Sequence, residues 1–213
     1  MTAEMSPLAR TVSASLSLTN PDLPWLWQPL LRLLAQGSPV TTEQLASATG
    51  HSSHEVHQAL AALPDTEYDD AGRIVGYGLT QRPTPHRFTV NGHQLYTWCA
   101  LDTLIFPAVL SRTAQVESPC HATGTPVRLD AAPDGITNVE PATAVVSLVT
   151  PGQCTSVRTA FCNHVHFFAS SEAAQGWLSE HPDATTLPIS DAFELGHQLA
   201  QQRMIPDGPP GCC

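Results

Sequence analysis

A thiol and a carboxyl group stand three positions apart near the middle of the chain, in the run YTWCALD. On a helix, positions i and i+3 share a face, so Cys99 and Asp102 are expected to project side by side. Their surroundings are apolar, and a low dielectric favours the neutral form of both groups. Such a pair is suited to holding and passing protons, unlike a Cys–His pair tuned for acyl attack. The alternative is a core thiol next to a carboxylate on the helix surface.

A second candidate lies in the run FCNHVHFF, which combines Cys162 with His164 and His166. The two histidines alternate with a valine in a β-like run and are expected to share one face of a strand. With Cys99 or Cys120 they could complete a zinc site of the Cys/His type. Neither a C-x-x-C nor an H-x-x-x-H pair occurs, and ordinary packed or hydrogen-bonded histidines are the alternative.

The remaining cysteines carry weaker signals. Cys120 precedes a glycine turn at the end of a predicted strand, where a small buried residue is the simplest interpretation. Cys212 and Cys213 are vicinal thiols in a Pro/Gly tail, and exposed pairs of this kind are oxidisable and capture soft metals. The alternative is a tail without a role. Cys154 has no motif around it.

Composition excludes several function classes. The chain has 213 residues, and its nine basic residues, all arginine, against 19 acidic ones give a net charge of −10. An acidic, lysine-free chain is a poor partner for a phosphate backbone or an anionic membrane. Its apolar runs are far shorter than the roughly 20 residues that cross a bilayer, and its start lacks the apolar core of a secretory signal. We therefore expect a cytoplasmic protein, in which cysteines are metal-binding or catalytic rather than paired in disulfides.

The residues before the first candidate site predict a winged helix-turn-helix outline. Helical periodicity spans 21–63 and divides into three helices, the second ending at Gly50 and the third opening with a capping box of Ser52 and Glu55. A turn at 70–72 between two short β-like runs then predicts a hairpin.

The rest of the chain alternates strands and helices. Residues 81–87 look like a linker, and Asn91-Gly92 is a strong hairpin signal. Further predicted elements are a helix over 98–110, strands over 113–118, 125–130 and 143–149, a short helix followed by a β-like run at 164–168, and helices over 171–180 and 190–204. The predicted fold is α+β, with a winged-helix-like helical domain followed by a mixed, mainly antiparallel sheet with flanking helices. The predicted divisions are a mobile arm (1–20), the helical domain (21–80), a catalytic domain (81–205) and a flexible tail (206–213).

Several stretches together resemble the organomercurial lyase (alkylmercury lyase) family. They are, in family order, EYD (67–69) with IVGYGLT (74–80), LYTWCALDTLIFP (95–107), CHATG (120–124) and FCNHVHFFAS (161–170). The resemblance covers about residues 22–200, and the two longest runs, each with a cysteine, are specific.

The resemblance implies protonolysis of a carbon–mercury bond, which yields a hydrocarbon and Hg²⁺ that a mercuric reductase then takes. The two cysteines and the aspartate that carry this reaction in the family correspond to Cys99, Cys162 and Asp102, which would also bind the mercury of substrate or product. Family members often have a second cysteine after the one that matches Cys162, where this chain has Asn163, and that position is regarded as dispensable. The cysteine that matches Cys120 is treated as structural.

This reaction needs soft ligands and a proton donor. Thiolates are the preferred protein ligands of mercury, and we expect a second thiolate to give the bound carbon carbanion character, which Asp102 then protonates. No organic cofactor is expected. The expected partners are the organomercurial substrate, low-molecular-weight thiols and a mercuric reductase. Aromatic side chains that could wall an apolar substrate pocket are Trp98, Phe106, Phe161 and Phe168.

Three other functions compete with this one. A DNA-binding regulator would fit the winged-helix outline, but the presumptive recognition helix, SSHEVHQALAAL (52–63), has no Arg or Lys. A metal store would need the cysteines without Asp102, and a structural zinc module would hold stoichiometric zinc. The terminal pair Cys212 and Cys213 resembles the one that ends mercuric reductases, so the tail is a candidate for collecting substrate or passing on product.

Overall fold

The computed structural model describes most of the chain, namely residues 7, 10–12, 23–150 and 156–204. The predicted tail with Cys212 and Cys213, Cys154 and most of the predicted arm lie outside the described residues. Within that arm, residues 10–12 are helical and the side chain of Val12 is buried.

Three short helices form the N-terminal region, as the sequence predicts. They are α2 (Pro24–Leu34), α3 (Thr42–Thr49) and α4 (Ser53–Ala61). Both α3 and α4 begin with capping boxes, and Gly50 ends α3 in the left-handed conformation with φ 73°. Four leucines of α2 face inward and are fully buried, because their spacing keeps them on one side of the helix: Leu26, Leu30, Leu31 and Leu34.

A three-stranded wing follows the helices. Its strands are β1 (Glu67–Tyr68), β2 (Ile74–Tyr77) and β3 (Leu79–Thr80). The predicted turn at 70–72 is confirmed, since the Asp69 carboxylate accepts hydrogen bonds from the backbone N–H groups of Ala71 and Arg73. Antiparallel pairing then carries the chain from β1 through β2 to β3.

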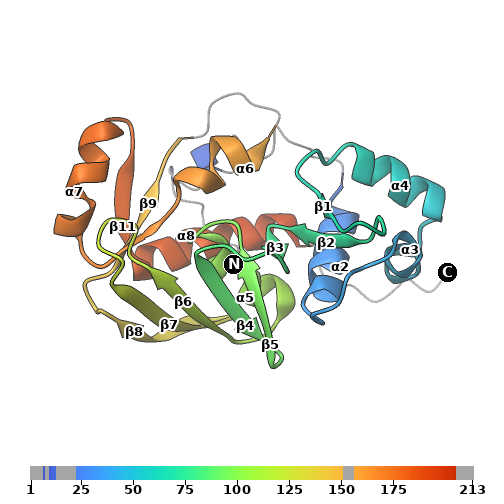
Figure 1. Ribbon diagram of the computed structural model, residues 1–213, viewed down its shortest axis with the longest axis horizontal. Helices are drawn as coiled ribbons and strands as arrows, with labels where there is room; N and C mark the ends of the chain where they lie inside the picture. The colour runs from blue at the N-terminus through green and yellow to red at the C-terminus, as the bar shows by residue number, and fades with distance from the viewer. Residues whose placement is uncertain (1–6, 8–9, 13–22, 151–155, 205–213) are drawn as a thin grey trace.

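The wing continues without interruption into the main sheet. Its further strands are β4 (His86–Val90), β5 (His93–Thr97), β6 (Ala114–Pro119), β7 (Pro126–Ala132) and β8 (Gly135–Glu140), in the order β1-β2-β3-β5-β4-β6-β7-β8. The pairing of β3 with β5 joins the two predicted domains in one sheet (Figure 1). The predicted linker over 81–87 is therefore wrong at its end, because His86 and Arg87 already belong to β4.

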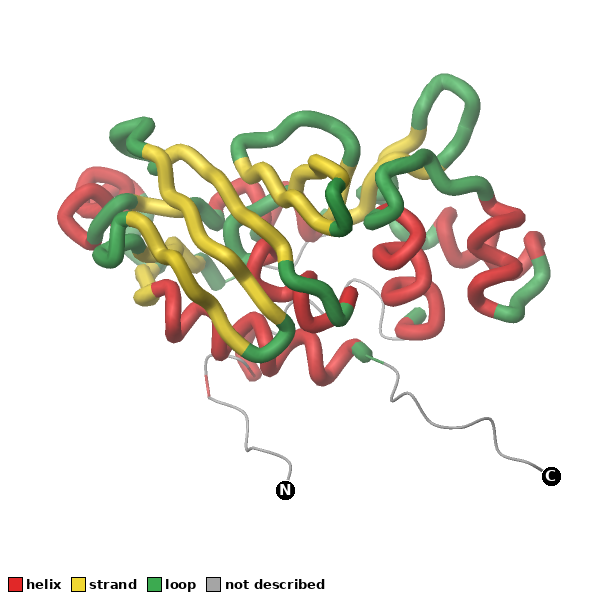
Figure 2. Tube along the Cα trace, turned by 90° about the horizontal axis from the view of Figure 1, so that it is seen from below, coloured by secondary structure: helices red, strands yellow, loops and turns green. Residues whose placement is uncertain are grey.

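A smaller sheet and four helices complete the fold. The sheet has the order β10-β9-β11, with β9 (Val145–Leu148) between β10 (Phe167–Phe168) and β11 (Thr185–Pro188). The helices are α5 (Asp102–Leu110), α6 (Val157–Ala160), α7 (Ser171–Glu180) and α8 (Ile189–Arg203). Figure 2 shows helices lying against the main sheet on one side. All described strand pairs are antiparallel, so the predicted α+β fold with a mainly antiparallel sheet is confirmed.

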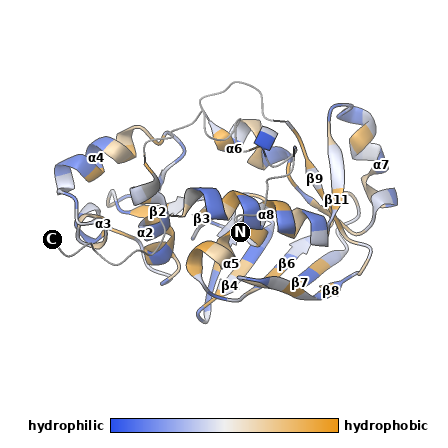
Figure 3. Cartoon of the chain, turned by 180° about the vertical axis from the view of Figure 1, so that it is seen from behind, coloured by the Kyte–Doolittle hydropathy of each residue, from blue (hydrophilic) through white to orange (hydrophobic). Residues whose placement is uncertain are grey.

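Helix α5 is the central buried element. Every residue from Thr103 to Leu110 is buried, and the helix is hydrophobic along its length in Figure 3. It packs against α8 and α2. The predicted helix over 98–110 starts too early, because the helix begins only at Asp102. No helix in the described part of the chain is long and apolar enough to cross a membrane.

Candidate active site

The structure brings Cys99, Asp102 and Cys162 together. Both sulfur atoms and one carboxylate oxygen lie within 4.8 Å of one another, and both cysteines are buried as free thiols. Asp102 is partly exposed. Among the described residues, this is the only group of three or more thiol, imidazole and carboxyl ligands that could hold a metal ion.

Cys99 and Asp102 lie close together for a different reason from the helical spacing that the sequence suggests. Cys99 lies in the turn that precedes α5, so the two residues are not one turn apart on a helix. Instead, the Cys99 backbone N–H donates to Asp102 Oδ2 at 3.2 Å. The Thr97 hydroxyl donates to the Cys99 carbonyl at 2.8 Å and helps to fix the same turn.

The segment that carries Cys162 is tied to this turn through the backbone. Cys162 begins a short 3₁₀ helix, Cys162–His164, directly after α6. The Ala100 N–H then donates to the Val165 carbonyl at 3.1 Å, which couples the two cysteine-bearing segments. From the other side, the buried Ser147 hydroxyl donates to the His164 carbonyl and accepts from the His166 N–H. Residues more than 60 positions apart are thus held in one place by main-chain bonds.

Burial and neighbouring charge keep both thiols protonated. Burial is the main cause that raises the pKa of Cys99 well above its usual value, and the hydrogen bond with Cys162 and the charge of Asp102 raise it further. The hydrogen bond from Cys99 lowers the pKa of Cys162, but burial and the carboxylates of Asp102 and Asp65 outweigh it and leave that pKa raised. The site therefore stores thiol protons until a metal with high affinity for sulfur displaces them.

An apolar pocket opens next to the three ligands. It encloses about 630 Å³, part of it open to solvent, and Asp102 and Cys162 lie in its wall. Of the four predicted wall residues, Trp98, Phe106 and Phe161 line it, whereas Phe168 lies elsewhere, in contact with Trp177 and His121. Sequence reasoning missed the rest of the lining, which comes from several elements: Trp27, Tyr77, Gly78, Ile105, Val157 and Leu199.

Gly78 shows why this pocket needs a glycine in its wall. Its φ of +79° is in the left-handed region, and a Cβ there would lie 2.8 Å from the Phe106 ring. The glycine in the run IVGYGLT was the available signal that this strand end approaches another side chain closely.

The histidines of the second candidate site gather at a different place. His164 belongs to the 3₁₀ helix and not to a strand, so the expected alternation with His166 is wrong. His166 stacks on His121, with ring centroids 3.9 Å apart, and His164 lies 5.9 Å from His181. The zinc site with Cys99 or Cys120 is not formed among the described residues.

Two buried or partly buried histidines, His86 and His166, make the free energy of unfolding dependent on pH. Burial, followed by the charges of His166 and His121, lowers the pKa of His86 to about 3, and burial with three neighbouring imidazoles lowers that of His166 to about 4. The unfolded chain binds these protons near pH 6.5, so the stabilisation is complete above that value and is lost as pH falls toward 4. We expect the urea concentration at the unfolding midpoint to decrease when the pH is lowered from 7.5 to 5. A urea midpoint that does not change with pH would contradict the assignment.

Cys120 is buried among backbone donors. Burial alone would raise its pKa, but hydrogen bonds from the Thr123 hydroxyl and from the backbone N–H groups of Ala169, Thr123 and Ala122 lower it below its usual value. The sulfur thus lies among donors that favour its charged form.

We therefore expect Cys120→Ala to lower the free energy of unfolding by about 1–3 kcal/mol, because it leaves these donors unpaired. Cys120→Ser should lose less, since its oxygen still accepts. Urea denaturation measures both, and equal stability of all three proteins would show that the sulfur has no such structural role.

The fold and the cluster together define a protein equipped to hold a soft metal ion between two thiols beside an apolar pocket. The family model for alkylmercury lyase matches residues 79–201, and the model for the helix-turn-helix domain of alkylmercury lyase matches residues 8–78. The chain belongs to the alkylmercury lyase family.

Individual relatives agree with this assignment. The chain is 66% identical to an alkylmercury lyase of Streptomyces lividans, over 89% of this chain and 88% of the relative. It is 56% identical to one of Staphylococcus epidermidis, with 90% and 89% covered. It is also similar to the crystal structure of the mercury-bound form of MerB2, with a TM-score of 0.75 and 25% identity over 91% of this chain and 99% of that one. The predicted enzyme class is confirmed.

Proposed function

We propose that this chain cleaves the carbon–mercury bond of alkyl and aryl mercurials by protonolysis, with Cys99, Cys162 and Asp102 as its catalytic residues. The observation that carries the proposal is the meeting of two buried free thiols and one carboxylate within 4.8 Å. Mercury is a soft metal and prefers thiolate ligands. The similarity to a structure described as the mercury-bound form of MerB2 supports mercury as the metal.

The proton balance follows from the protonated thiols. The first thiol exchanges with the ligand that the substrate carries, which forms a sulfur–mercury bond and releases one proton. The second thiol passes its proton to the Asp102 carboxylate as its own sulfur binds mercury. Asp102 then gives this proton to the carbon, the carbon–mercury bond breaks, and Hg²⁺ remains bound by both sulfurs. No electrons are exchanged with another group, so the step needs no organic cofactor.

The apolar pocket supports the choice of substrate. Trp98, Phe106 and Phe161 line the same pocket as two of the candidate catalytic residues. They would surround the methyl or phenyl group of a mercurial whose mercury is bound by the two sulfurs. External thiols, such as low-molecular-weight thiols or those of a mercuric reductase, would then remove Hg²⁺ by exchange. Cys212 and Cys213 remain a candidate tail for handling mercury.

The direct test is headspace analysis with excess thiol. Wild-type protein should release methane from methylmercury and benzene from phenylmercury, with one Hg²⁺ per molecule of hydrocarbon. A protein that binds both compounds and releases neither hydrocarbon would be a mercury store, and the proposed reaction would be wrong.

A further inference from the structure

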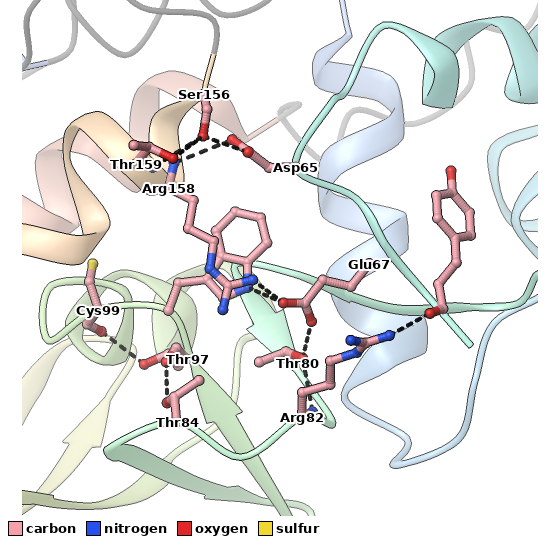
Figure 4. A network of polar contacts seen from close by, with 12 residues as sticks. Asp65, Glu67, Thr80, Arg82, Thr84, Thr97, Cys99, Ser156, Arg158 and Thr159 are labelled. Carbon is pink, nitrogen blue, oxygen red and sulfur yellow. Dashed lines mark hydrogen bonds and ion pairs between the residues drawn. The ribbon is translucent and has the colours of Figure 1, made fainter. Parts of the chain in front are cut away.

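Glu67 belongs to the edge strand β1, and its side chain reaches Thr80 on β3 and Trp98 just after β5. Its side chain is only 9% exposed, yet its carboxylate accepts from three donors. These are an ion pair with Arg158, the Trp98 indole N–H at 3.2 Å, and the Thr80 hydroxyl. Figure 4 shows Arg158 reaching from α6 to this carboxylate, with Thr80 on its other side. A buried carboxylate with this many partners is a structured site and not a solvated surface charge.

The surrounding backbone leaves room for this carboxylate. At Gly76, on the neighbouring strand β2, an added Cβ would collide with Glu67 Oε2 and with the Thr80 side chain. Any larger residue would therefore displace the Glu67 side chain. The glycine has no unusual φ that would otherwise require it. The space that the carboxylate needs is thus a sufficient reason for glycine at this position.

Two of the three donors lie close in sequence to a proposed mercury ligand. Trp98 directly precedes Cys99, and Arg158 lies on α6, four residues before Cys162. The Arg158 guanidinium also lies over the Trp98 ring, 5.1 Å from its centroid. Asp65 holds the start of the same helix, because it accepts from the Ser156 hydroxyl at 2.6 Å and from the Arg158 backbone N–H at 3.3 Å. Two acidic residues beside the wing thus fasten the segment that bears Cys162.

We propose that Glu67 is a positioning residue for the carbon–mercury cleavage, and that it sets the separation of Cys99 and Cys162 by holding Trp98 and Arg158 on one carboxylate. This inference rests on the proposed function. It also gives the wing a role in the reaction, because β1 supplies the carboxylate. A shift of about 1 Å between reacting groups can cost roughly 100-fold in rate, so loss of this anchor should be visible in turnover.

The first experiment compares two matched glutamates. Glu67→Gln keeps the shape of the side chain but loses the charge, and should lower kcat/KM for methylmercury by roughly 10- to 100-fold. Glu117→Gln is the control. Like Glu67, Glu117 forms ion pairs with arginine, here with Arg87 and Arg128, but it lies on an exposed part of the sheet outside the pocket. Glu117→Gln should leave turnover unchanged. If Glu67→Gln turns over like wild type while wild type releases methane, Glu67 has no positioning role and only this inference fails.

Arg158→Gln tests the same anchor from the other partner, and it covers the case in which Glu67→Gln does not fold. Arg158 is 37% exposed at its side chain, so Arg158→Gln is expected to fold. If the two residues act as one unit, Arg158→Gln should lower kcat/KM by a similar factor. The kcat/KM of the double variant should then be no lower than that of the less active single variant. Losses that multiply in the double variant, or full activity of Arg158→Gln, would overturn the proposal.

Capture of a dithiol reagent reports the sulfur separation directly. Phenylarsine oxide forms two arsenic–sulfur bonds with a close pair of thiols and releases water, so its affinity depends on their distance. In a background with Cys212→Ser and Cys213→Ser, Glu67→Gln should weaken phenylarsine oxide binding by about the factor lost in kcat/KM. Reduced turnover with unchanged arsenical affinity would place the defect elsewhere and refute the positioning role.

Discussion

Cys162→Ser should stop the release of methane from methylmercury, with a loss of about 10³-fold or more in kcat/KM. Serine occupies the same buried position, but its hydroxyl is a hard ligand that does not replace a thiolate at mercury. With one sulfur left, Cys99 can still bind the organomercurial, yet the carbon does not gain the electron density that its protonation needs. Headspace gas chromatography with excess thiol measures the effect, and Cys99→Ser should behave in the same way.

A third buried cysteine provides the control for this result. Cys120 is as well buried as the other two but lies outside the three-residue cluster. Cys120→Ser should therefore keep its turnover at temperatures where it remains folded. Near-normal cleavage of methylmercury or phenylmercury by Cys162→Ser would refute the model with two thiolates.

Asp102→Asn should separate binding from cleavage. Asparagine has the same shape, and its side-chain oxygen can still accept the hydrogen bond that the Cys99 N–H makes at 3.2 Å. The two thiols therefore stay in place, but the side chain can no longer take a thiol proton and deliver it to carbon. We expect bound organomercurial at wild-type stoichiometry and cleavage slowed by roughly 10²- to 10⁴-fold, the range for loss of a general acid–base group.

Single-turnover measurement distinguishes these two steps. Protein loaded with one equivalent of phenylmercury is separated from free reagent, and benzene is then followed with time. Asp130→Asn is a suitable control, because Asp130 is a carboxylate on β7 that accepts a hydrogen bond from Asn138 and belongs neither to the three-residue cluster nor to the lining of the apolar pocket. Undiminished benzene release by Asp102→Asn would remove Asp102 from the mechanism.

Local signals in the sequence were sufficient for most of the N-terminal region. The end of α3 at Gly50, the capping box of α4, the turn over 70–72 and the Asn91-Gly92 hairpin all involve residues at most four positions apart, and each formed as predicted. The sequence did not predict strands β8 and β11, because they lack such a local signal. Both carry mixed exposed and half-buried residues, so they lack the alternation that marks a strand, and their pairing partners decide their conformation.

At the candidate site, too, the sequence predicted the residues, whereas the structure decided how they come together. Residue types and motif order pointed to Cys99, Asp102 and Cys162, but the argument from helix spacing was wrong, because Cys99 lies before the helix. What places it beside Asp102 is a turn closed by its own N–H. The pocket wall supplied by Trp27 and Tyr77, and the Glu67 anchor, carried no signal in the residues around the cysteines.

By itself, the sequence determined the family, the fold class and the elements whose hydrogen bonds close within a few positions, and it pointed to the three residues of the candidate site. Only the tertiary structure decided that the two thiols meet beneath a wall partly built by the N-terminal region, and that one sheet joins both halves of the chain. The physical reason is that these contacts join residues far apart in the chain. Their formation depends on how whole elements pack and pair, which no short stretch of sequence encodes.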